Sequence, residues 1–183
     1  MSRVAQESQI KRQLVVLVDQ NNRKIGTEEK LKAHTDGKLH RAFSIFVFNS
    51  KGELLLQQRA KSKYHSGGLW SNTVCSHPCP GENYVQAVHR RLKEEMGFDC
   101  DLKKLFSFTY KTNFEDGLIE NEYDTVFMGK FDGLPKLNST EVANYKWIKI
   151  EDLKKDISKN PAKYSVWLKI ILDRPQDMVI QTS

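Results

Sequence analysis

Residues 82–98 read ENYVQAVHRRLKEEMGF, and this stretch predicts the clearest helix of the chain, Asn83–Met96. Asn83 and Gln86, three residues apart, are typical of a capping box at a helix start. Gly97 occupies the position at which many helices end. Apolar side chains recur at intervals of three or four residues, which places them on one helix face: Val85, Val88, Leu92 and Met96. We therefore expect an amphipathic helix.

A second face of this helix carries Ala87, Arg91 and Glu95, each four residues from the next. The ordinary interpretation of such an Arg/Glu pair is an exposed salt bridge. The surrounding spacing favours a more specific one, because Glu82 is followed after seven residues by Arg90 and then by the run RLKEEMGF. This pattern resembles a Nudix box, the loop–helix–loop signature of enzymes that bind a metal diphosphate.

Two positions depart from the Nudix signature. Ser76 stands where the leading glycine is usual, and Arg91 stands where a glutamate is usual. The resemblance implies that the glutamate usual at this position belongs to the hydrolytic metal site of the Nudix family. A cation in its place therefore favours phosphate binding over diphosphate hydrolysis.

Short runs on both sides of the helix predict strands: Leu14–Val18, Ala42–Phe48, Leu54–Arg59, Leu105–Lys111, Glu122–Met128 and Tyr145–Ile150. A turn at residues 49–52 predicts a hairpin. Pro161–Leu172 predicts a last helix, with proline at a permitted first position. Together these elements predict an α/β (α+β) fold in which helices sandwich a Nudix-type mixed β-sheet.

The length of 183 residues favours a single domain. We expect that domain at residues 14–175, between a flexible N-terminal tail (residues 1–13) and a C-terminal tail (residues 176–183). With 39% hydrophobic and 28% charged residues, the composition is that of a globular protein. No apolar run approaches the roughly 18 residues of a membrane span, and no secretory signal is evident. The expected location is the cytoplasm, with no membrane partner.

Charge and cysteine usage narrow the function classes further. The net charge of +6 is compatible with nucleic acid, but no dense basic block supports that partner. A few lysines and arginines that bind a small phosphorylated substrate would explain the excess of positive charge equally well. The odd count of three cysteines argues against a disulfide framework. Cys75 is therefore considered a free thiol.

Residues 72–78, NTVCSHP, place Cys75 and His77 on the same side if the segment is extended. A buried cysteine and a histidine capping a turn are the plainer interpretation. A zinc finger is discounted, although Cys75 and Cys79 flank His77, because no second Cys or His pair follows at finger spacing.

Further candidate ligands are two carboxylates and two histidines. Glu120 and Glu122 face one side if they lie on a strand. If buried, two like charges require a cation or a raised pKa; a solvated acidic loop is the alternative. His34 and His40 precede the strand at Phe43, where a lone histidine is usually just exposed. With His77, the set would offer three nitrogens and two oxygens, which suit Mn²⁺, Zn²⁺ or Fe²⁺.

Five ordered segments together resemble type I isopentenyl diphosphate isomerase, over about Leu14 to Trp167. They are EKLKAH (29–34), LHRAFS (39–44), QRAKSK (58–63), LWSNTVCSHP (69–78) and ENE (120–122). The resemblance implies interconversion of isopentenyl and dimethylallyl diphosphate in isoprenoid precursor biosynthesis. A match in five ordered segments is far more specific than any one of them.

This resemblance also implies the site residues. The tight divalent site, for Mn²⁺ or Zn²⁺, would comprise His34, His40, His77, Glu120 and Glu122. A Mg²⁺ that arrives with the diphosphate would be held by Glu95 and the backbone carbonyl of Cys75. The cations that bind the diphosphate would be Lys30, Arg59, Lys63 and Arg91.

The implied chemistry adds a proton to the terminal alkene carbon and removes one from C2, through a tertiary carbocation. Glu122 and Cys75 resemble the two groups on opposite faces of the substrate. Glu122, with Tyr110 nearby, would give the proton, and the Cys75 thiolate would take one. Trp167 resembles the aromatic that faces the cation, a contact worth about 2 kcal/mol when desolvated. Without the resemblance, Trp167 would be interpreted as a core residue.

Two alternatives rank below an isomerase. The first is a Nudix hydrolase of a nucleoside or prenyl diphosphate, against which Arg91, Cys75 and the His/Glu set count. The second is a catalytically silent module that binds diphosphate or RNA. The expected partner is a small prenyl diphosphate, and the expected state is a monomer or weak dimer.

Overall fold

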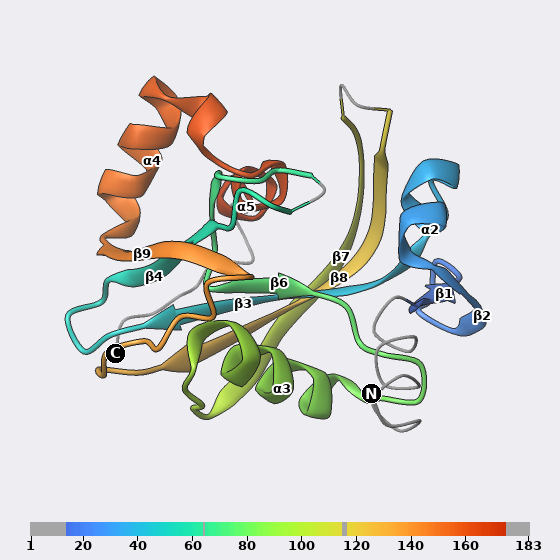
Figure 1. Cartoon of the computed structure of the whole chain (residues 1–183), viewed down its shortest axis with the longest axis horizontal. Coiled ribbons are helices and arrows are strands. Elements are labelled where there is room, and N and C mark those ends of the chain that lie inside the picture. Colours follow the sequence, from blue (N-terminus) through green and yellow to red (C-terminus); the bar gives the residue numbers. More distant parts are fainter. Residues whose placement is uncertain (1–13, 64, 115–116, 175–183) are drawn as a thin grey trace. The chain divides into compact units, whose positions relative to one another are not determined.

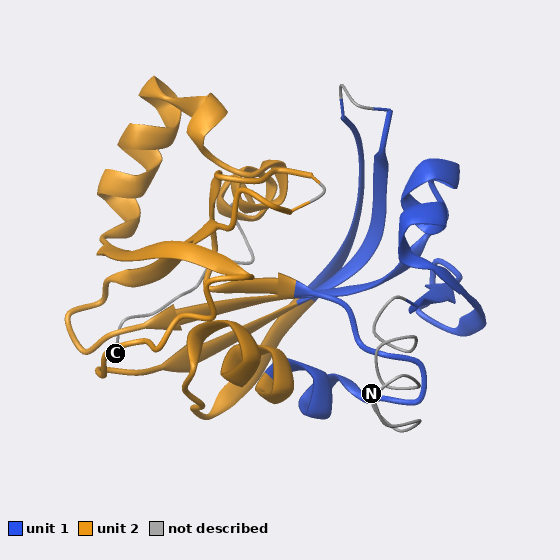
Figure 2. Ribbon diagram, viewed as in Figure 1, with its two compact units in different colours: residues 1–43, 76–88, 107–125 blue, residues 44–75, 89–106, 126–183 orange. Residues whose placement is uncertain are grey.

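The computed structural model describes residues 14–174, apart from residues 64, 115 and 116 (Figure 1). Both predicted tails, residues 1–13 and 176–183, lie outside the described residues, so the predicted domain limits stay a prediction. The chain divides into two compact units, shown in Figure 2. Unit 1 comprises residues 1–43, 76–88 and 107–125, and unit 2 comprises residues 44–75, 89–106 and 126–183.

Unit 1 contains a hairpin and a short helix. Strand β1 (Leu14–Val18) pairs antiparallel with β2 (Lys24–Glu29), and the Asp19 carboxylate accepts two backbone N–H groups in the turn between them. Helix α2 (Lys30–Asp36) follows β2 directly and ends at Gly37, whose φ of 62° lies in the left-handed region that glycine tolerates. Leu17 of β1 pairs with His40, the first residue of strand β3 (His40–Phe48).

Unit 2 is built around strand β4 (Leu54–Arg59). It pairs antiparallel with β9 (Val142–Ile148) along its length, and the register shifts at Gln58/Arg59. It also pairs with β5 (Trp70–Ser71) and, at Phe48↔Leu54, with β3. Helix α4 (Ile150–Lys159), the 3₁₀ turn η1 (Pro161–Lys163) and helix α5 (Val166–Leu172) follow β9. The core of unit 2 includes Leu54, Leu55, Leu56, Leu153 and Leu168, none of which is exposed.

The remaining elements contribute residues to both units: β3, β6 (Val74–Ser76), α3 (Tyr84–Met96), β7 (Leu102–Asn113) and β8 (Ile119–Lys130). β3 pairs with β6 and β8, and β8 also pairs with β7. The ladders β1–β2, β4–β5 and β4–β9 are antiparallel, whereas Trp70 and Tyr164 form a parallel bridge. Strands thus combine with four α-helices among the described residues, which confirms the expected α+β class with a mixed sheet.

Helix α3 forms where it was predicted, and its capping box is confirmed. Asn83 N donates to Gln86 Oε1 (3.1 Å), and Gln86 N donates to Asn83 Oδ1 (2.9 Å). At Gly97 φ is 71°, and a side chain there would clash with the backbone of Lys136. The predicted apolar face holds for Val88, Leu92 and Met96, which are buried. Val85, one turn earlier, is 62% exposed and does not belong to the core.

Other boundaries differ from the predictions. The helix predicted over Pro161–Leu172 is interrupted: Tyr164 and Ser165 have extended backbone between η1 and α5. The strand predicted over Tyr145–Ile150 is also displaced. It begins at Val142 and ends at Ile148, because Ile150 already opens α4. Strand β2 and helices α2 and α4 were not predicted. Every helix that the structure describes is too short or too polar to span a bilayer.

Candidate functional site

Two buried histidines in unit 1 have their side-chain orientation fixed by backbone carbonyls. His34 Nδ1 lies 2.7 Å from the carbonyl oxygen of Lys30, one turn earlier in α2. His40 Nδ1 lies 2.8 Å from the carbonyl oxygen of Lys38. Because a carbonyl oxygen only accepts, both Nδ1 atoms carry the proton. In each neutral ring the Nε2 atom then has the lone pair that a metal ion requires.

Glu122 lies at the centre of this group of histidines. Its Oε1 atom is 3.5 Å from His40 Nε2 and 3.0 Å from His77 Nε2. Both His40 and Glu122 are buried. One ligand atom from each of His34, His40, His77 and Glu122 lies within 4.8 Å of the others, so the described residues contain a cluster that could hold a metal ion.

Burial and charge keep this cluster in the state that metal binding needs. Burial lowers the pKa of His34 to about 4. It also lowers the pKa of His77 well below the ordinary value, so both rings are neutral near pH 7. Burial alone raises the pKa of Glu122, but the close contacts with the rings of His40 and His77 outweigh burial and hold that pKa well below its usual range. The neutral imidazoles of His34 and His77 therefore lie beside an ionised carboxylate.

Tyr110 brings the second glutamate to the same cluster. Its hydroxyl oxygen lies 2.7 Å from Glu122 Oε2 and 3.0 Å from Glu120 Oε2. Glu120 and Glu122 are 3% and 2% exposed, so neither has bulk water as its partner. The tyrosine has one proton to donate to two buried carboxylates. The donor set of three imidazoles and two carboxylates fits a divalent transition metal, whose charge would offset the excess of negative charge.

Unit 2 contains a separate cluster of charged side chains around Arg91 of α3. Arg91 Nη2 donates to Glu95 Oε1 (2.6 Å) and to Glu141 Oε2 (2.9 Å), and Nη1 donates to Glu94 (2.9 Å). Glu141 also contacts the ammonium of Lys63. The exposed salt bridge considered for Arg91 and Glu95 is therefore wrong in one respect: the pair is present, but Glu95 is only 3% exposed.

Arg59 and Trp167 form a second group in unit 2. The guanidinium of Arg59 lies over the Trp167 ring at 5.2 Å and donates to the His65 carbonyl at 3.2 Å. Arg59 Nε has no hydrogen-bond partner among the residues that the structure describes. Trp167 itself is 1% exposed, so it is a core residue as well as a candidate for cation binding.

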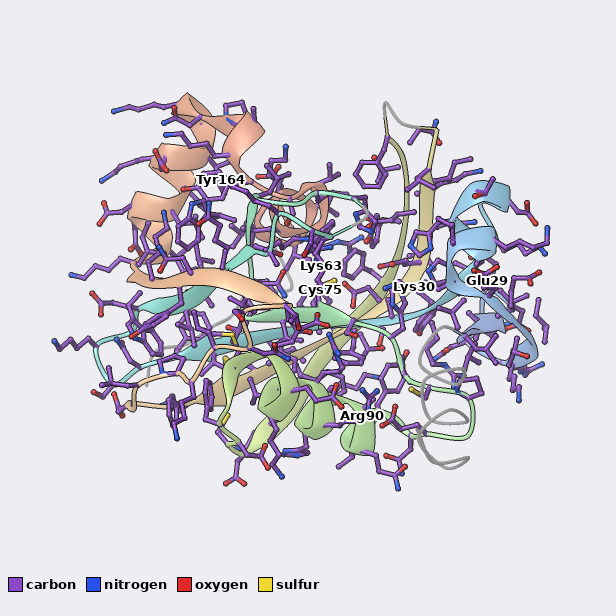
Figure 3. All side chains as sticks on the ribbon, viewed as in Figure 1. Glu29, Lys30, Lys63, Cys75, Arg90 and Tyr164 are labelled. Carbon is purple, nitrogen blue, oxygen red and sulfur yellow. The ribbon has the colours of Figure 1, made fainter. Side chains whose placement is uncertain are left out.

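Cys75 lies in β6 and is partly exposed, and its side chain is labelled in Figure 3 together with that of Lys63. The hydroxyl of Ser44 makes a long contact of 3.9 Å with the Cys75 sulfur. Lys30 is the first residue of α2 in unit 1, where its carbonyl orients His34. The structure therefore brings His34, His40, His77 and Glu122 together in unit 1, and Tyr110 joins Glu120 to Glu122 there. It brings Arg91, Lys63 and Glu95 together in unit 2.

Sequence reasoning missed three side chains in these groups. Glu141 contacts both Lys63 and Arg91, while Ser71 and Asn72 accept from the Trp167 indole. Glu141 belongs to no motif and lies 50 residues from Arg91. Ser71 and Asn72 lie within the motif at residues 69–78, but neither was predicted to have a role. Pairing of Arg59 with Val142 brings the preceding residue, Glu141, beside the 59–63 segment.

Comparisons with known proteins agree on the fold and on the kind of relative. A model described as NUDIX domain matches residues 38–168. Isopentenyl-diphosphate Delta-isomerase 2 of Aromatoleum aromaticum is 56% identical over 160 residues, which are 87% of this chain and 85% of that protein. Isopentenyl-diphosphate Delta-isomerase of Pectobacterium atrosepticum is 47% identical over 163 residues, 89% of this chain and 91% of that protein.

Solved structures show the same fold at low sequence identity. The crystal structure of DR0079 from Deinococcus radiodurans has a TM-score of 0.71 at 19% identity and covers 86% of this chain and 96% of that chain. A MutT NUDIX hydrolase from Burkholderia pseudomallei has a TM-score of 0.59 at 18% identity, with 75% and 98% covered. These likenesses concern the fold alone.

Proposed function

The chain belongs to the isopentenyl-diphosphate Delta-isomerases of the NUDIX domain family, and from this membership we propose that it interconverts isopentenyl and dimethylallyl diphosphate by protonation and deprotonation. The observation that carries the proposal is the buried cluster in unit 1. There, three histidines surround Glu122, and the Tyr110 hydroxyl contacts the same carboxylate. In this group the Tyr110 hydroxyl holds a proton beside a carboxylate that can relay it.

The acid in this proposal is Glu122 together with Tyr110. The alkene has no polarising substituent, so a strong acid must add a proton to its terminal carbon. The short hydrogen bond from Tyr110 to Glu122 (2.7 Å) gives the carboxylate a partner that can hold or pass a proton. A divalent cation bound by His34, His40, His77, Glu120 and Glu122 would supply positive charge that tunes this acidity. We propose Mn²⁺ or Zn²⁺ for this site, because imidazole and carboxylate donors suit them.

The base in this proposal is the Cys75 thiolate, which takes the proton from C2 and completes the shift of the double bond. The Ser44 hydroxyl lies 3.9 Å from its sulfur, on the side from which a donor could reach a thiolate. Trp167 would stabilise the intermediate cation through its ring face. The guanidinium carbon of Arg59 lies 5.2 Å from the ring centroid. This contact supports the proposed role, because the ring already faces a cation.

The diphosphate would be bound by Lys30, Arg59, Lys63 and Arg91. Arg59 is suited to this role, since its Nε atom has no hydrogen-bond partner among the described residues. Around Arg91, by contrast, the cations of Arg90, Arg91 and Lys63 face the three carboxylates of Glu94, Glu95 and Glu141, so the cluster has no excess of positive charge. An anion would therefore need to arrive with a divalent cation. We propose Mg²⁺ with the diphosphate, held by Glu95 and the Cys75 carbonyl.

The remaining parts of the proposal concern context. We propose that residues 14–175 form the catalytic domain, that the protein acts in the cytoplasm as a monomer or weak dimer, and that neither nucleic acid nor membrane is a partner. The composition supports the last two parts, because it contains no apolar run long enough for a membrane span and no dense basic block.

A proton NMR time course with isopentenyl diphosphate and Mg²⁺ in D₂O tests the function. We expect dimethylallyl diphosphate that carries deuterium. Release of phosphate with an unchanged alkene would instead identify a hydrolase. No change, with Mn²⁺ and Zn²⁺ also supplied in turn, would favour a diphosphate-binding module without catalysis.

A further inference from the structure

A buried polar network in unit 2 connects the Trp167 indole to the strand that carries Cys75. Trp167 Nε1 donates to Ser71 Oγ (2.7 Å) and to Asn72 Oδ1 (3.2 Å). Ser165, which precedes α5, donates to the same Ser71 hydroxyl at 3.1 Å. Ser71, Asn72 and Ser165 are all 0% exposed, so water does not compete for these hydrogen bonds.

Asn72 uses the full hydrogen-bonding capacity of its amide. Its Nδ2 atom donates to the backbone carbonyls of Val74 (2.7 Å) and Ile45 (3.2 Å). Its Oδ1 atom accepts from the Ser71 hydroxyl (3.0 Å) as well as from Trp167. An amide has two donor hydrogens and two acceptor lone pairs, and all four are used here. Reversing the amide would set NH₂ against the indole N–H, so only one orientation satisfies the network.

This arrangement links two elements that the proposed reaction uses. Val74, whose carbonyl accepts from Asn72, directly precedes Cys75 in β6. Trp167, whose N–H donates to Asn72, is the proposed partner of the carbocation. One side chain therefore holds both the aromatic ring and the backbone next to the proposed base.

We propose that Asn72 is a positioning residue for the isomerisation, because its single amide fixes the Trp167 indole and the Val74–Cys75 backbone relative to each other. This inference rests on the proposed function. Asn72 is not proposed to contact the substrate, and it acts only through Trp167 and Cys75. Displacement of a reacting group by about 1 Å costs on the order of 100-fold in rate, so loss of this tie is expected to lower kcat and to leave KM nearly unchanged.

The matched pair Asn72→Ala and Ser71→Ala separates positioning from general destabilisation. Both substitutions remove a buried acceptor of the indole N–H, but only Asn72 also contacts the Val74 carbonyl. Turnover is measured on full-length, metal-loaded protein whose folding is verified by circular dichroism. We expect kcat of Asn72→Ala to fall about 100-fold with KM within about threefold. Ser71→Ala is expected to lose much less.

Two readouts that need no turnover follow the link itself. In a ¹⁵N NMR spectrum, the Trp167 indole resonance is expected to shift in Asn72→Ala. The rate of Cys75 alkylation is expected to change about threefold or more, with Cys100 as the internal reference. If Asn72→Ala does not fold, Asn72→Asp keeps the acceptor for the indole but removes both donors to the backbone. That variant is expected to keep the indole resonance and to change the Cys75 alkylation rate.

The outcomes distinguish this inference from the function on which it rests. Absence of isomerisation by the wild-type protein would overturn both. Wild-type isomerisation combined with equal losses of kcat in Asn72→Ala and Ser71→Ala would overturn the positioning role alone. An unchanged Cys75 alkylation rate in both Asn72 variants would do the same.

Discussion

Replacement of Tyr110 by phenylalanine tests the proposed acid with little change of shape. The substitution removes one hydroxyl, and with it the contacts to Glu122 Oε2 (2.7 Å) and Glu120 Oε2 (3.0 Å). A hydrogen bond to a charged group contributes about 1.5–3 kcal/mol. Both carboxylates are at most 3% exposed, so water does not replace the lost donor.

The expected effect on stability depends on metal. In protein treated with a chelator, Tyr110→Phe should lower the free energy of unfolding by about 2 kcal/mol, or shift Tm by about 4–8 °C for a chain of this size. With Mn²⁺ or Zn²⁺ restored, the loss should be smaller, because the cation offsets the two carboxylates. Urea unfolding followed by circular dichroism, with and without chelator, measures both values.

The expected effect on catalysis is larger. General acid catalysis contributes about 10²–10⁴-fold, so kcat should fall at least about 100-fold, and KM should stay within about twofold since Tyr110 is not proposed to bind the diphosphate. Tyr123→Phe is the matched control. It makes the same chemical change on β8 next to Glu122, at a partly exposed position. Wild-type kcat in Tyr110→Phe, or an equal destabilisation with and without metal, would refute the assignment of Tyr110 to the acid.

Three other substitutions test the remaining roles. Cys75→Ala should abolish isomerisation but leave folding and diphosphate affinity nearly intact; measurable turnover by NMR would remove Cys75 as the base. His40→Ala should release the tightly bound metal, as measured by elemental analysis. The control His89→Ala, at a partly exposed position paired with Asp99, should retain the metal. Equal metal content in the two variants would contradict the proposed ligand set. Arg91→Glu should raise KM for isopentenyl diphosphate and destabilise the fold by about 3 kcal/mol, because it leaves a cluster of carboxylates without their shared cation; an unaltered KM in a kinetic assay would mean that Arg91 does not bind substrate.

Local patterns were sufficient for the elements whose signals lie within a few residues. The capping box at Asn83 and Gln86 and the hairpin between β3 and β4 both formed as predicted, since turn and cap chemistry acts over short distances. The helix predicted over Pro161–Leu172 was wrong in its middle. Ser165 N donates to the carbonyl of Trp70 in the distant strand β5. The backbone at Tyr164 and Ser165 is therefore extended and separates η1 from α5.

The sequence by itself determined the family and the list of candidate ligands, because five ordered segments and a Nudix box are local patterns of residues. Only the tertiary structure decided how those residues are partnered. The Nδ1 contacts that give His34 and His40 their tautomers depend on α2 and on the entry into β3. Likewise, Glu141 meets Arg91 because strand β9 pairs with β4. A side-chain contact such as that between Glu141 and Arg91 joins residues that lie far apart in the chain, so spacing along the sequence does not predict it.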